Sequence, residues 1–306
     1  MSEIAVLGGI NMDLVVAVPH IPRPGETVQG GEVRRFPGGK GANQAVAAAR
    51  LASSVSLIGQ VGQDHFGEEL LASLCRENVG TGAVRQVANH PTGVALISVA
   101  ADGQNAIVVA PGANMAWDGA AIAALAVHLA GCRVLVANLE VPTAVVREAL
   151  ACARRNGARV ILNPAPYRAG DECLFAGVDV LVPNQIEAAL FAGLKPERVT
   201  SWEAVGARLG SLGPQHIVLT LAGDGALLLT KEETVRVQAF PVPVVDTTAA
   251  GDAFVGGLAV AVIEGRPLRE AVQFGNACGA LAVTQVGAQP SLPDRRAAET
   301  LLAGGR

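Results

Sequence analysis

The sequence predicts an α/β protein with a three-layer α/β/α arrangement around a mostly parallel sheet, and a small second β-sheet. Strand-like apolar runs alternate with helical patterns through most of the 306 residues, and this alternation is typical of βαβ crossovers. Half of the residues are apolar, yet only 3% are aromatic. Ala, Val, Leu and Ile must therefore pack the core, which suits helices layered on a parallel sheet.

The expected elements follow one another along the chain. A strand at 4–9 comes first, and a helix follows the glycine-rich turn near residue 40. Further strands are expected at 55–62, 133–140, 159–166, 178–184 and 216–229, the last with a turn inside it. Further helices are expected at 65–78, in the first part of 120–139, at 143–157, from 185, at 250–265, at 267–285 and after Pro293.

Two stretches, 14–36 and 92–109, have short alternating strands and turns with no helix between them. We expect a single domain over 1–306 in which these insertions form a lid; two ordinary surface hairpins are the alternative. One apolar face of such a sheet has to be covered by a ligand, by the body or by a second copy. The residues expected on that face are Val15, Ala17, Ala95, Ile97 and Val99. A monomer would expose them, which predicts a homodimer through the lid.

Composition excludes several classes of protein. The net charge of −4 offers no basic surface for nucleic acid. The most apolar long stretch, 120–139, is interrupted by His128 and Arg133, so no membrane span is expected. The N-terminus enters a strand directly, without the pattern of a signal peptide. The five scattered cysteines contain no Cys-x-x-Cys motif, which predicts reduced thiols in a cytoplasmic protein.

The stretch "PGGKGANQAVAAAR" places Gly39, Lys40, Gly41 and Asn43 at the start of a helix. It is not a Walker A loop, because Lys40 is followed by Gly41 and Ala42. Its backbone N–H groups and its lysine nevertheless suit polar ligand oxygens, and the glycines allow close approach. The alternative is a glycine-rich turn in which Asn43 caps the helix.

The stretch "VDTTAAGDAFVGGLA" predicts a second binding feature. Asp246 and Thr247 are expected to end a strand, and Ala249, Ala250 and Gly251 to open a helix with Asp252 in its first turn. Outward N–H groups at a helix start make an anion hole, and small residues let a phosphate approach. Asp252 as a plain partner of the helix dipole is the alternative, but that role does not require the small residues beside it.

Three weaker signals remain. Asn184 and Glu187 fit a capping box. The glycine turn at 222–225 is either a loop that faces a nucleotide or a simple hairpin turn. Asn11, Asp13 and Glu140 place polar groups at carboxyl ends of strands, where ligands collect in open α/β sheets.

Together these stretches resemble the ribokinase-like, or PfkB-type, carbohydrate kinases. The resemblance runs in order through "LGGINMD", "PGGKGANQAVAAAR", "TGVALISV", "NPAP", "PNQIEA", "VDTTAAGDAF" and "GAQPSLP", over nearly the whole chain. The long glycine–lysine string and the D-T-x-A-A-G-D string are specific. The N-x-x-E pattern at Asn184 and Glu187 and the glycine turn at 222–225 are supporting. The resemblance implies the ribokinase-like fold with its small β-sheet lid.

The resemblance also implies an activity, the ATP-dependent phosphorylation of the 5-hydroxyl of D-ribose. Asp252 would be the general base, and the backbone of Ala249, Ala250, Gly251 and Asp252 the anion hole. The residues implied around the sugar are Asn11, Met12, Asp13, Gly39, Lys40, Gly41, Ala42, Asn43, Glu140 and Asp252. Met12, between two sugar-facing residues, would tune the choice of sugar.

Three further sets follow from the resemblance. Asn184 and Glu187 would organise hydrated Mg²⁺ and the ATP phosphates. The residues implied along the nucleotide are Thr220, Leu221, Ala222, Gly223, Asp224, Gly225, Gly251, Asp252 and Asn276. The residues implied around K⁺ are Asp246, Thr248, Ala282, Gln285, Gly287 and Ser291.

The chain departs from the family pattern at Ala222, where glycine is frequent, and at Asn276, where a histidine can lie against adenine. Both departures bear on nucleotide preference. Two alternatives stay open at this point. One is a kinase for deoxyribose, a ketohexose or a nucleoside, and the other is a catalytically silent sugar sensor, against which the intact Asp252 speaks.

Overall fold

The computed structural model describes residues 3–51 and 54–304. A nine-stranded sheet has the order β13-β12-β11-β10-β9-β8-β1-β4-β5, and a four-stranded sheet has the order β3-β2-β6-β7. The strands are β1 (Ile4–Leu7), β2 (Asn11–Val18), β3 (Val33–Gly38), β4 (Val55–Gly62), β5 (Gly80–Val87), β6 (Gly93–Ala100), β7 (Asn105–Ala110), β8 (Val134–Asn138), β9 (Arg159–Asn163), β10 (Val180–Leu181), β11 (His216–Thr220), β12 (Ala226–Leu229) and β13 (Thr234–Val237). The helices are α1 (Lys40–Leu51), α2 (His65–Arg76), α3 (Gly119–His128), α4 (Thr143–Arg155), α5 (Gln185–Phe191), α6 (Trp202–Gly210), α7 (Ala250–Ile263), α8 (Leu268–Ala282) and α9 (Arg295–Gly304).

The large sheet is parallel from β5 to β11 and antiparallel at the β11–β12 and β12–β13 pairs. Parallel neighbours need long crossover connections, which the intervening helices provide. The prediction of a mostly parallel sheet is therefore confirmed.

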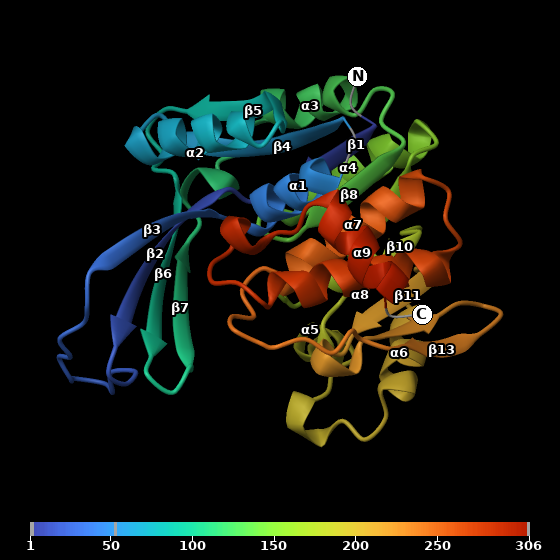
Figure 1. Cartoon of the computed structure of the whole chain (residues 1–306). Coiled ribbons are helices and arrows are strands. Elements are labelled where there is room, and N and C mark those ends of the chain that lie inside the picture. The colour runs from blue at the N-terminus through green and yellow to red at the C-terminus, as the bar shows by residue number, and fades with distance from the viewer. Residues whose placement is uncertain (1–2, 52–53, 305–306) are drawn as a thin grey trace.

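Helices cover both faces of this sheet, and each face has its own core (Figure 1). In β1, Ile4 and Val6 pack into one core with residues of α1, α7 and α8, while Ala5 and Leu7 pack into the other with residues of α4 and α6. Alternate residues of a strand point to opposite faces, so a strand that is apolar throughout must be covered on both. The predicted three-layer α/β/α arrangement is confirmed.

The second sheet extends away from the body (Figure 1). Its hairpins β2–β3 and β6–β7 are antiparallel, and β2 and β6 join them in parallel. The two stretches expected to form this sheet, 14–36 and 92–109, contain most of its strand residues. Large apolar side chains are exposed on it, among them Ile107 (53%) and Val108 (66%) of the edge strand β7.

The expected strand ending at Asp246 and Thr247 is wrong. Residues 238–249 form an irregular segment, because Pro241 and Pro243 have no N–H groups to contribute to a ladder. The strands β5 and β13 and the helix α6 were not expected from the sequence.

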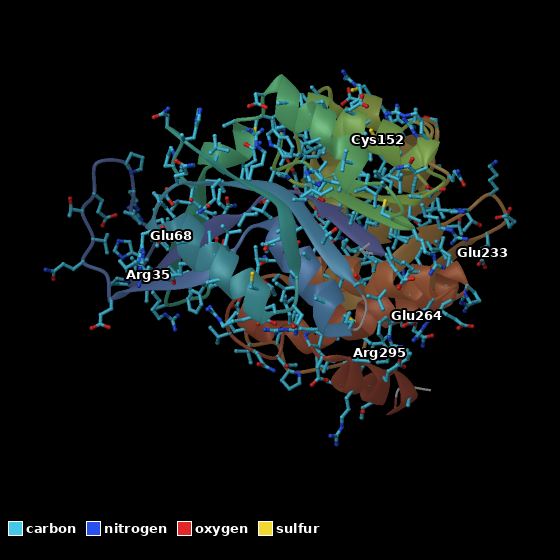
Figure 2. The ribbon with its side chains drawn as sticks, turned by 90° about the horizontal axis from the view of Figure 1, so that it is seen from above. Arg35, Glu68, Cys152, Glu233, Glu264 and Arg295 are labelled. Carbon is cyan, nitrogen blue, oxygen red and sulfur yellow. The ribbon has the colours of Figure 1, made fainter. Side chains whose placement is uncertain are left out.

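Charged side chains lie around the outside of both sheets, for example Arg35, Glu68 and Glu233 (Figure 2). Near the C-terminus, Arg295 pairs with Glu264 and with Glu299, which ties α9 to the end of α7. The five cysteines are free thiols. In the described part of the chain, the helices are all too short or too polar to cross a membrane.

Candidate active site

A glycine turn brings the start of α1 against the start of β2. Gly39, between β3 and α1, has φ +90°, a conformation that side chains rarely adopt. A Cβ there would lie 2.7 Å from the backbone nitrogen of Asn11. The sequence "PGGKGAN" is therefore glycine-rich because two backbone segments touch at this point.

At this contact, the carboxylates of Glu140 and Asp13 each pack directly against a glycine. A Cβ on Gly9 would meet Glu140 Oε2 at 2.4 Å, and one on Gly38 would meet Asp13 Oδ2 at 2.2 Å. The backbone N–H of Lys40 donates to Glu140 Oε2 over 2.8 Å. The sheets thus converge here, with Asp13 from β2 and Glu140 from the loop after β8.

Asn114 fixes the neighbouring Asn11. Its side chain bonds both the N–H and the C=O of Ile10 and donates to Asn11 Oδ1 over 2.7 Å. Met12 differs from Asn11 and Asp13, because it lies on the other face of β2 and packs fully buried in the core. This position does not support the expectation that its side chain tunes the choice of sugar.

Asp252 lies in the first turn of α7 and is only 6% exposed. Its Oδ2 accepts from Asn43 Nδ2 over 2.9 Å, and its Oδ1 accepts from Gln44 Nε2 over 3.0 Å. Asn43 Oδ1 is buried and has no partner among the described residues. A buried oxygen without a donor is costly, so this atom is suited to accept from a ligand hydroxyl.

Burial dominates the electrostatics of this group of carboxylates. It raises the pKa of Asp13 to about 7, with Glu140 and Asp252 adding repulsion. Burial also raises the pKa of Glu140 to about 7 against the opposing effect of Lys40. The pKa of Asp252 is raised by burial too, although Lys40, Asn43 and Gln44 lower it.

Lys40 is the cation among these acids. Burial acts to lower its pKa, but the charges of Asp252, Glu140 and Glu187 outweigh burial and raise the pKa above its ordinary value. Lys40 is therefore protonated at neutral pH. Perturbed carboxylates around one lysine, at the carboxyl ends of parallel strands, are typical of a catalytic site.

The start of α7 presents free backbone donors. Ala249 has φ +59° at the N-cap, and a Cβ on the exposed Gly251 would meet open space. The N–H of Ala250 donates to Thr247 O over 3.3 Å, so it is not free as the sequence led us to expect. Among the described residues, the N–H groups of Ala249, Gly251 and Asp252 have no acceptor.

The Asn184–Glu187 motif lies at the start of α5. Asn184 and Glu187 form the expected capping box, with bonds of 2.8 and 2.9 Å. Asn184 also bridges to Thr220 at the end of β11. Burial raises the pKa of Glu187.

The second glycine turn, at 222–225, connects β11 and β12, as expected. It contains a 3-10 turn over Ala222–Asp224. A Cβ on Gly225 would meet Val237 O at 2.1 Å. Asn276 Nδ2 donates to the same Val237 O and to Gln238 O, each over 3.0 Å. The turn and Asn276 therefore meet at the segment that follows β13.

The two loops expected to hold a cation lie side by side. The N–H of Gly287 donates to Asp246 Oδ2 over 2.8 Å, and Asp246 Oδ1 accepts from Thr248 N and Oγ1. The N–H of Val245 donates to Val283 O over 2.7 Å. The hydrogen bonds to Thr248 and Gly287 hold the pKa of Asp246 below its ordinary value against burial.

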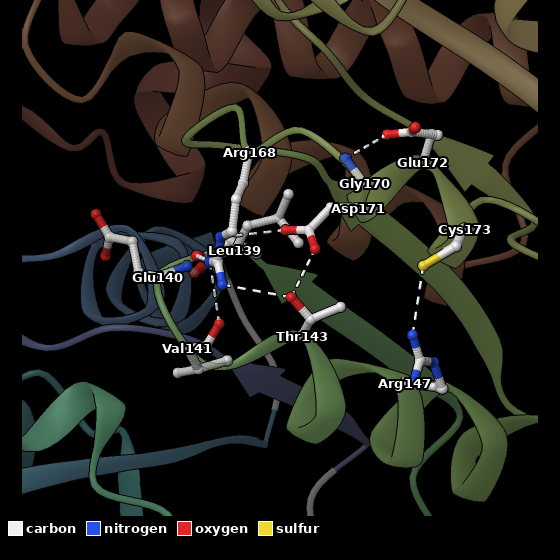
Figure 3. A network of polar contacts seen from close by, with 11 residues as sticks. Leu139, Glu140, Val141, Thr143, Arg147, Arg168, Gly170, Asp171, Glu172 and Cys173 are labelled. Carbon is white, nitrogen blue, oxygen red and sulfur yellow. Dashed lines mark hydrogen bonds and ion pairs between the residues drawn. The ribbon is translucent and has the colours of Figure 1, made fainter.

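A polar network braces the backbone around Glu140 (Figure 3). Arg168 Nη2 donates to Leu139 O over 2.5 Å and to Val141 O over 3.3 Å, on either side of Glu140. Asp171, 2% exposed, holds Arg168 through an ion pair of 3.3 Å and accepts from Thr143 Oγ1 over 2.6 Å.

Sequence reasoning missed the amides Gln44, Asn138 and Asn163, which surround Asp252 and Glu140. One signal was available, because the runs "VLVAN", "RVILN" and "VLVPN" end three strand regions on Asn138, Asn163 and Asn184. An amide at each of three neighbouring strand ends indicates a polar layer at that edge of the sheet.

Buried carboxylates around one lysine, beside free N–H groups at a helix start, are chemically suited to an enzyme site for a polyhydroxyl ligand and an anion. The chain belongs to the pfkB family of carbohydrate kinases, whose model matches residues 1–295. It is 37% identical over 300 residues to a ribokinase of Haemophilus influenzae, covering 98% of this chain and 97% of that one. It is 35% identical over 292 residues to a deoxyribokinase of Salmonella typhi, covering 95% of each.

Among solved structures, a ribokinase of Arabidopsis thaliana complexed with ribose and ATP superposes with a TM-score of 0.87. The sequences are 30% identical, and 98% of each chain is covered. The predicted family and the ribokinase-like fold are confirmed.

Proposed function

We propose that this protein phosphorylates the 5-hydroxyl of D-ribose with ATP. The single observation that carries the proposal is Asp252, a buried carboxylate at the start of α7 that accepts a hydrogen bond from Asn43 in the first turn of α1. Support comes from the ribokinase relatives and from the Arabidopsis complex with ribose and ATP.

Asn11, Asp13, Asn43 and Glu140 bind the sugar in this proposal. Ribose hydroxyls are both donors and acceptors, and the site offers unpaired carboxylate and amide oxygens as acceptors. Gly39 and Gly41 keep the backbone close enough for the backbone and side chains at 40–43 to reach the ligand.

Asp252 accepts the proton of the 5-hydroxyl while the bond to the γ-phosphorus forms. The leaving group is ADP, and the proton ends on Asp252. Phosphoryl transfer has a loose transition state, so positioning and charge neutralisation supply most of the rate. The free N–H groups of Ala249, Gly251 and Asp252, together with the Lys40 ammonium, stabilise the charge that builds up on the transferred group.

ATP lies along 220–225, 237–239 and Asn276, which meet beside α7. Mg²⁺, when bound, neutralises charge on the phosphates. The Glu187 carboxylate and the Asn184 amide, which lie together in the capping box, fit such a hydrated ion, because Mg²⁺ keeps several waters beside one or two carboxylates. Glu187 and Asn184 would hold those waters.

We also propose a K⁺ site behind the anion hole. The carbonyl oxygens of Thr248, Gln285 and Gly287 accept no hydrogen bond in the described structure, and the carboxylate of Asp246 ties their loops together. Carbonyl oxygens in such a number can replace the hydration shell of a large monovalent cation. Ala282 and Ser291 complete the proposed set.

The second sheet is proposed to act as the lid and as the surface of a homodimer. A lid at the sugar would exclude water, which otherwise competes as acceptor. We place the protein in the cytoplasm, where its five free thiols would stay reduced.

A second candidate substrate is 2-deoxyribose, because a deoxyribokinase is among the relatives. The two sugars differ in the 2-hydroxyl alone, and a site built to bond that group rejects the analogue that lacks it. Coupled measurement of ADP release with ribose, deoxyribose, a ketohexose and a nucleoside separates the candidates. A higher kcat/KM for deoxyribose than for ribose would replace the proposed substrate.

The variant Asp252→Asn tests the chemistry. We expect kcat to fall by about 100-fold or more, since general-base catalysis contributes on that scale, while calorimetry still detects ribose binding. The control is Asp118→Asn, which alters an exposed N-cap of α3 and leaves the site untouched. Turnover above roughly a tenth of the wild-type value would rule out Asp252 as the base.

A further inference from the structure

A ladder of side-chain amides crosses the carboxyl ends of the central strands and ends on Asp252. Asn138 Nδ2 donates to Gln44 Oε1 over 3.3 Å. Gln44 Nε2 donates to Asn163 Oδ1 and to Asp252 Oδ1, each over 3.0 Å. Gln44 and Asn138 are both 0% exposed, so water does not compete for these bonds.

Backbone groups at the two ends of the ladder leave each amide a single orientation. At one end the N–H of Glu140 donates to Asn138 Oδ1 over 3.2 Å, and at the other Asn163 Nδ2 donates to Val182 O over 2.8 Å. A backbone N–H only donates and a C=O only accepts. Asn138 must therefore turn its nitrogen to Gln44, which leaves the nitrogen of Gln44 facing Asp252.

This polarity gives each oxygen of Asp252 one fixed amide donor, Gln44 on Oδ1 and Asn43 on Oδ2. Rotation of the carboxylate would break both bonds. Donors to an ionised carboxylate also favour its ionised form. The other charged groups that act on this carboxylate are Lys40, Asp13, Glu140 and Glu187.

We propose that Gln44 is a positioning residue for the phosphoryl transfer, which holds the Asp252 carboxylate in one orientation and ready to accept the proton. The ladder from Glu140 to Val182 sets the direction of that hydrogen bond. The inference rests on the proposed role of Asp252 as the base. Both polar atoms of the Gln44 side chain are engaged by Asn138, Asn163 and Asp252.

The test compares Gln44→Met with Gln60→Met. Gln60 lies in β4, is also 0% exposed, and its amide nitrogen donates to Ala113 O and Ala116 O, each over 3.0 Å. Both variants lose a buried amide of the same size, so both should lose stability. Only Gln44→Met should lower kcat, by about tenfold or more at neutral pH, with the ribose KM changed less than about threefold.

The pH profile of kcat provides the readout that a structural role would not change. Gln44→Met removes a hydrogen-bond donor to the ionised Asp252 carboxylate. The acid limb of the kcat profile should therefore move to a pH higher by roughly one unit. Gln44→Glu, which keeps the shape of the side chain, places a second carboxyl beside Asp252 and should move the limb further. Gln60→Met should keep the wild-type limb.

Each outcome decides one point. An acid limb in both Gln44 variants that matches Gln60→Met would overturn the inference, even where Asp252→Asn abolishes turnover. High turnover in Asp252→Asn would instead remove the base itself, and the inference with it. If the pH of the acid limb of kcat increases in the order wild type, Gln44→Met, Gln44→Glu, the positioning role of Gln44 is supported.

Discussion

At the scale of the residue, the carboxylates proposed to bind the sugar are buried, and burial of their charged form costs stability. Asp13 is 8% exposed, and the site contains three further acids against one lysine. No hydrogen bond of the described residues goes to its carboxylate, which lies against Gly38 beside the glycine turn before α1. Function rather than folding therefore explains an ionisable group at this position.

The stability of the protein should depend on pH through Asp13. Its pKa is about 7 in the folded protein and near 3.8 when unfolded, so the folded state binds more protons between these values. The free energy of unfolding then falls as pH rises through that window. Asp13→Asn should remove this loss and raise stability by up to about 4 kcal/mol at alkaline pH, with little change at acid pH.

Urea unfolding of both proteins at about pH 3.5, below the unfolded pKa, and at about pH 8 measures the effect. The sugar kinase activity of Asp13→Asn should be lost at the same time. A stability difference that is equal at both pH values would contradict the assigned cause.

At the scale of the element, the turn between β11 and β12 contains a strained alanine. Ala222 has φ +51°, a left-handed conformation that costs a residue with a Cβ about 1 kcal/mol. The family often has glycine at this position, and the backbone explains why.

Ala222→Gly should therefore raise the melting temperature, by the few degrees that up to about 1 kcal/mol produces. The matched control is Ala207→Gly on the exposed side of α6, where glycine should destabilise by about the same amount. Differential scanning calorimetry measures both. Destabilisation in both variants would show that the turn is not strained.

The loops at 246–248 and 282–291 should make the enzyme depend on K⁺. The cation would fix the loop that presents the N–H groups before α7, so it should raise kcat without contacting either substrate. Initial rates in matched K⁺, Na⁺ and tetramethylammonium buffers measure this, and the K⁺ effect should be lost in Asp246→Ala. Equal rates in all three buffers would exclude the site.

At the scale of the whole molecule, the exposed apolar surface of the second sheet predicts a homodimer. Apart from Ala17, which is exposed, the residues first expected to form that surface are less exposed than the edge strand β7. Ala95 is buried and Ile97 is half-buried, while Ile107 and Val109, which pair with them in β7, are 53% and 49% exposed. Apolar side chains side by side on an edge strand favour association.

Light scattering should give about twice the chain mass of 31.1 kDa at micromolar concentration. Ile107→Lys should shift the protein to monomer, because it would bury an unpaired charge. Val127→Lys, on an exposed valine of α3 outside the sheet, should leave the mass unchanged. A monomeric wild-type protein would rule out the dimer.

The sequence alone determined the alternation of strands and helices and the strings around Lys40 and Asp252. Local patterns are sufficient for these features, because the spacing of apolar residues distinguishes a helix from a strand and glycines indicate turns and close backbone contacts. It did not determine the outcome at 238–249, where apolar residues resembled a strand and two prolines prevented one.

Only the tertiary structure decided which polar side chains are hydrogen-bonded to one another. Gln44, Asn138 and Asn163 lie on α1, β8 and β9, and the hydrogen bonds between them join residues far apart in the chain. It also decided that Met12 packs in the core, on the far face of β2 from its neighbours. Such contacts arise when separate elements pack against one another, and no local pattern of residues specifies their direction.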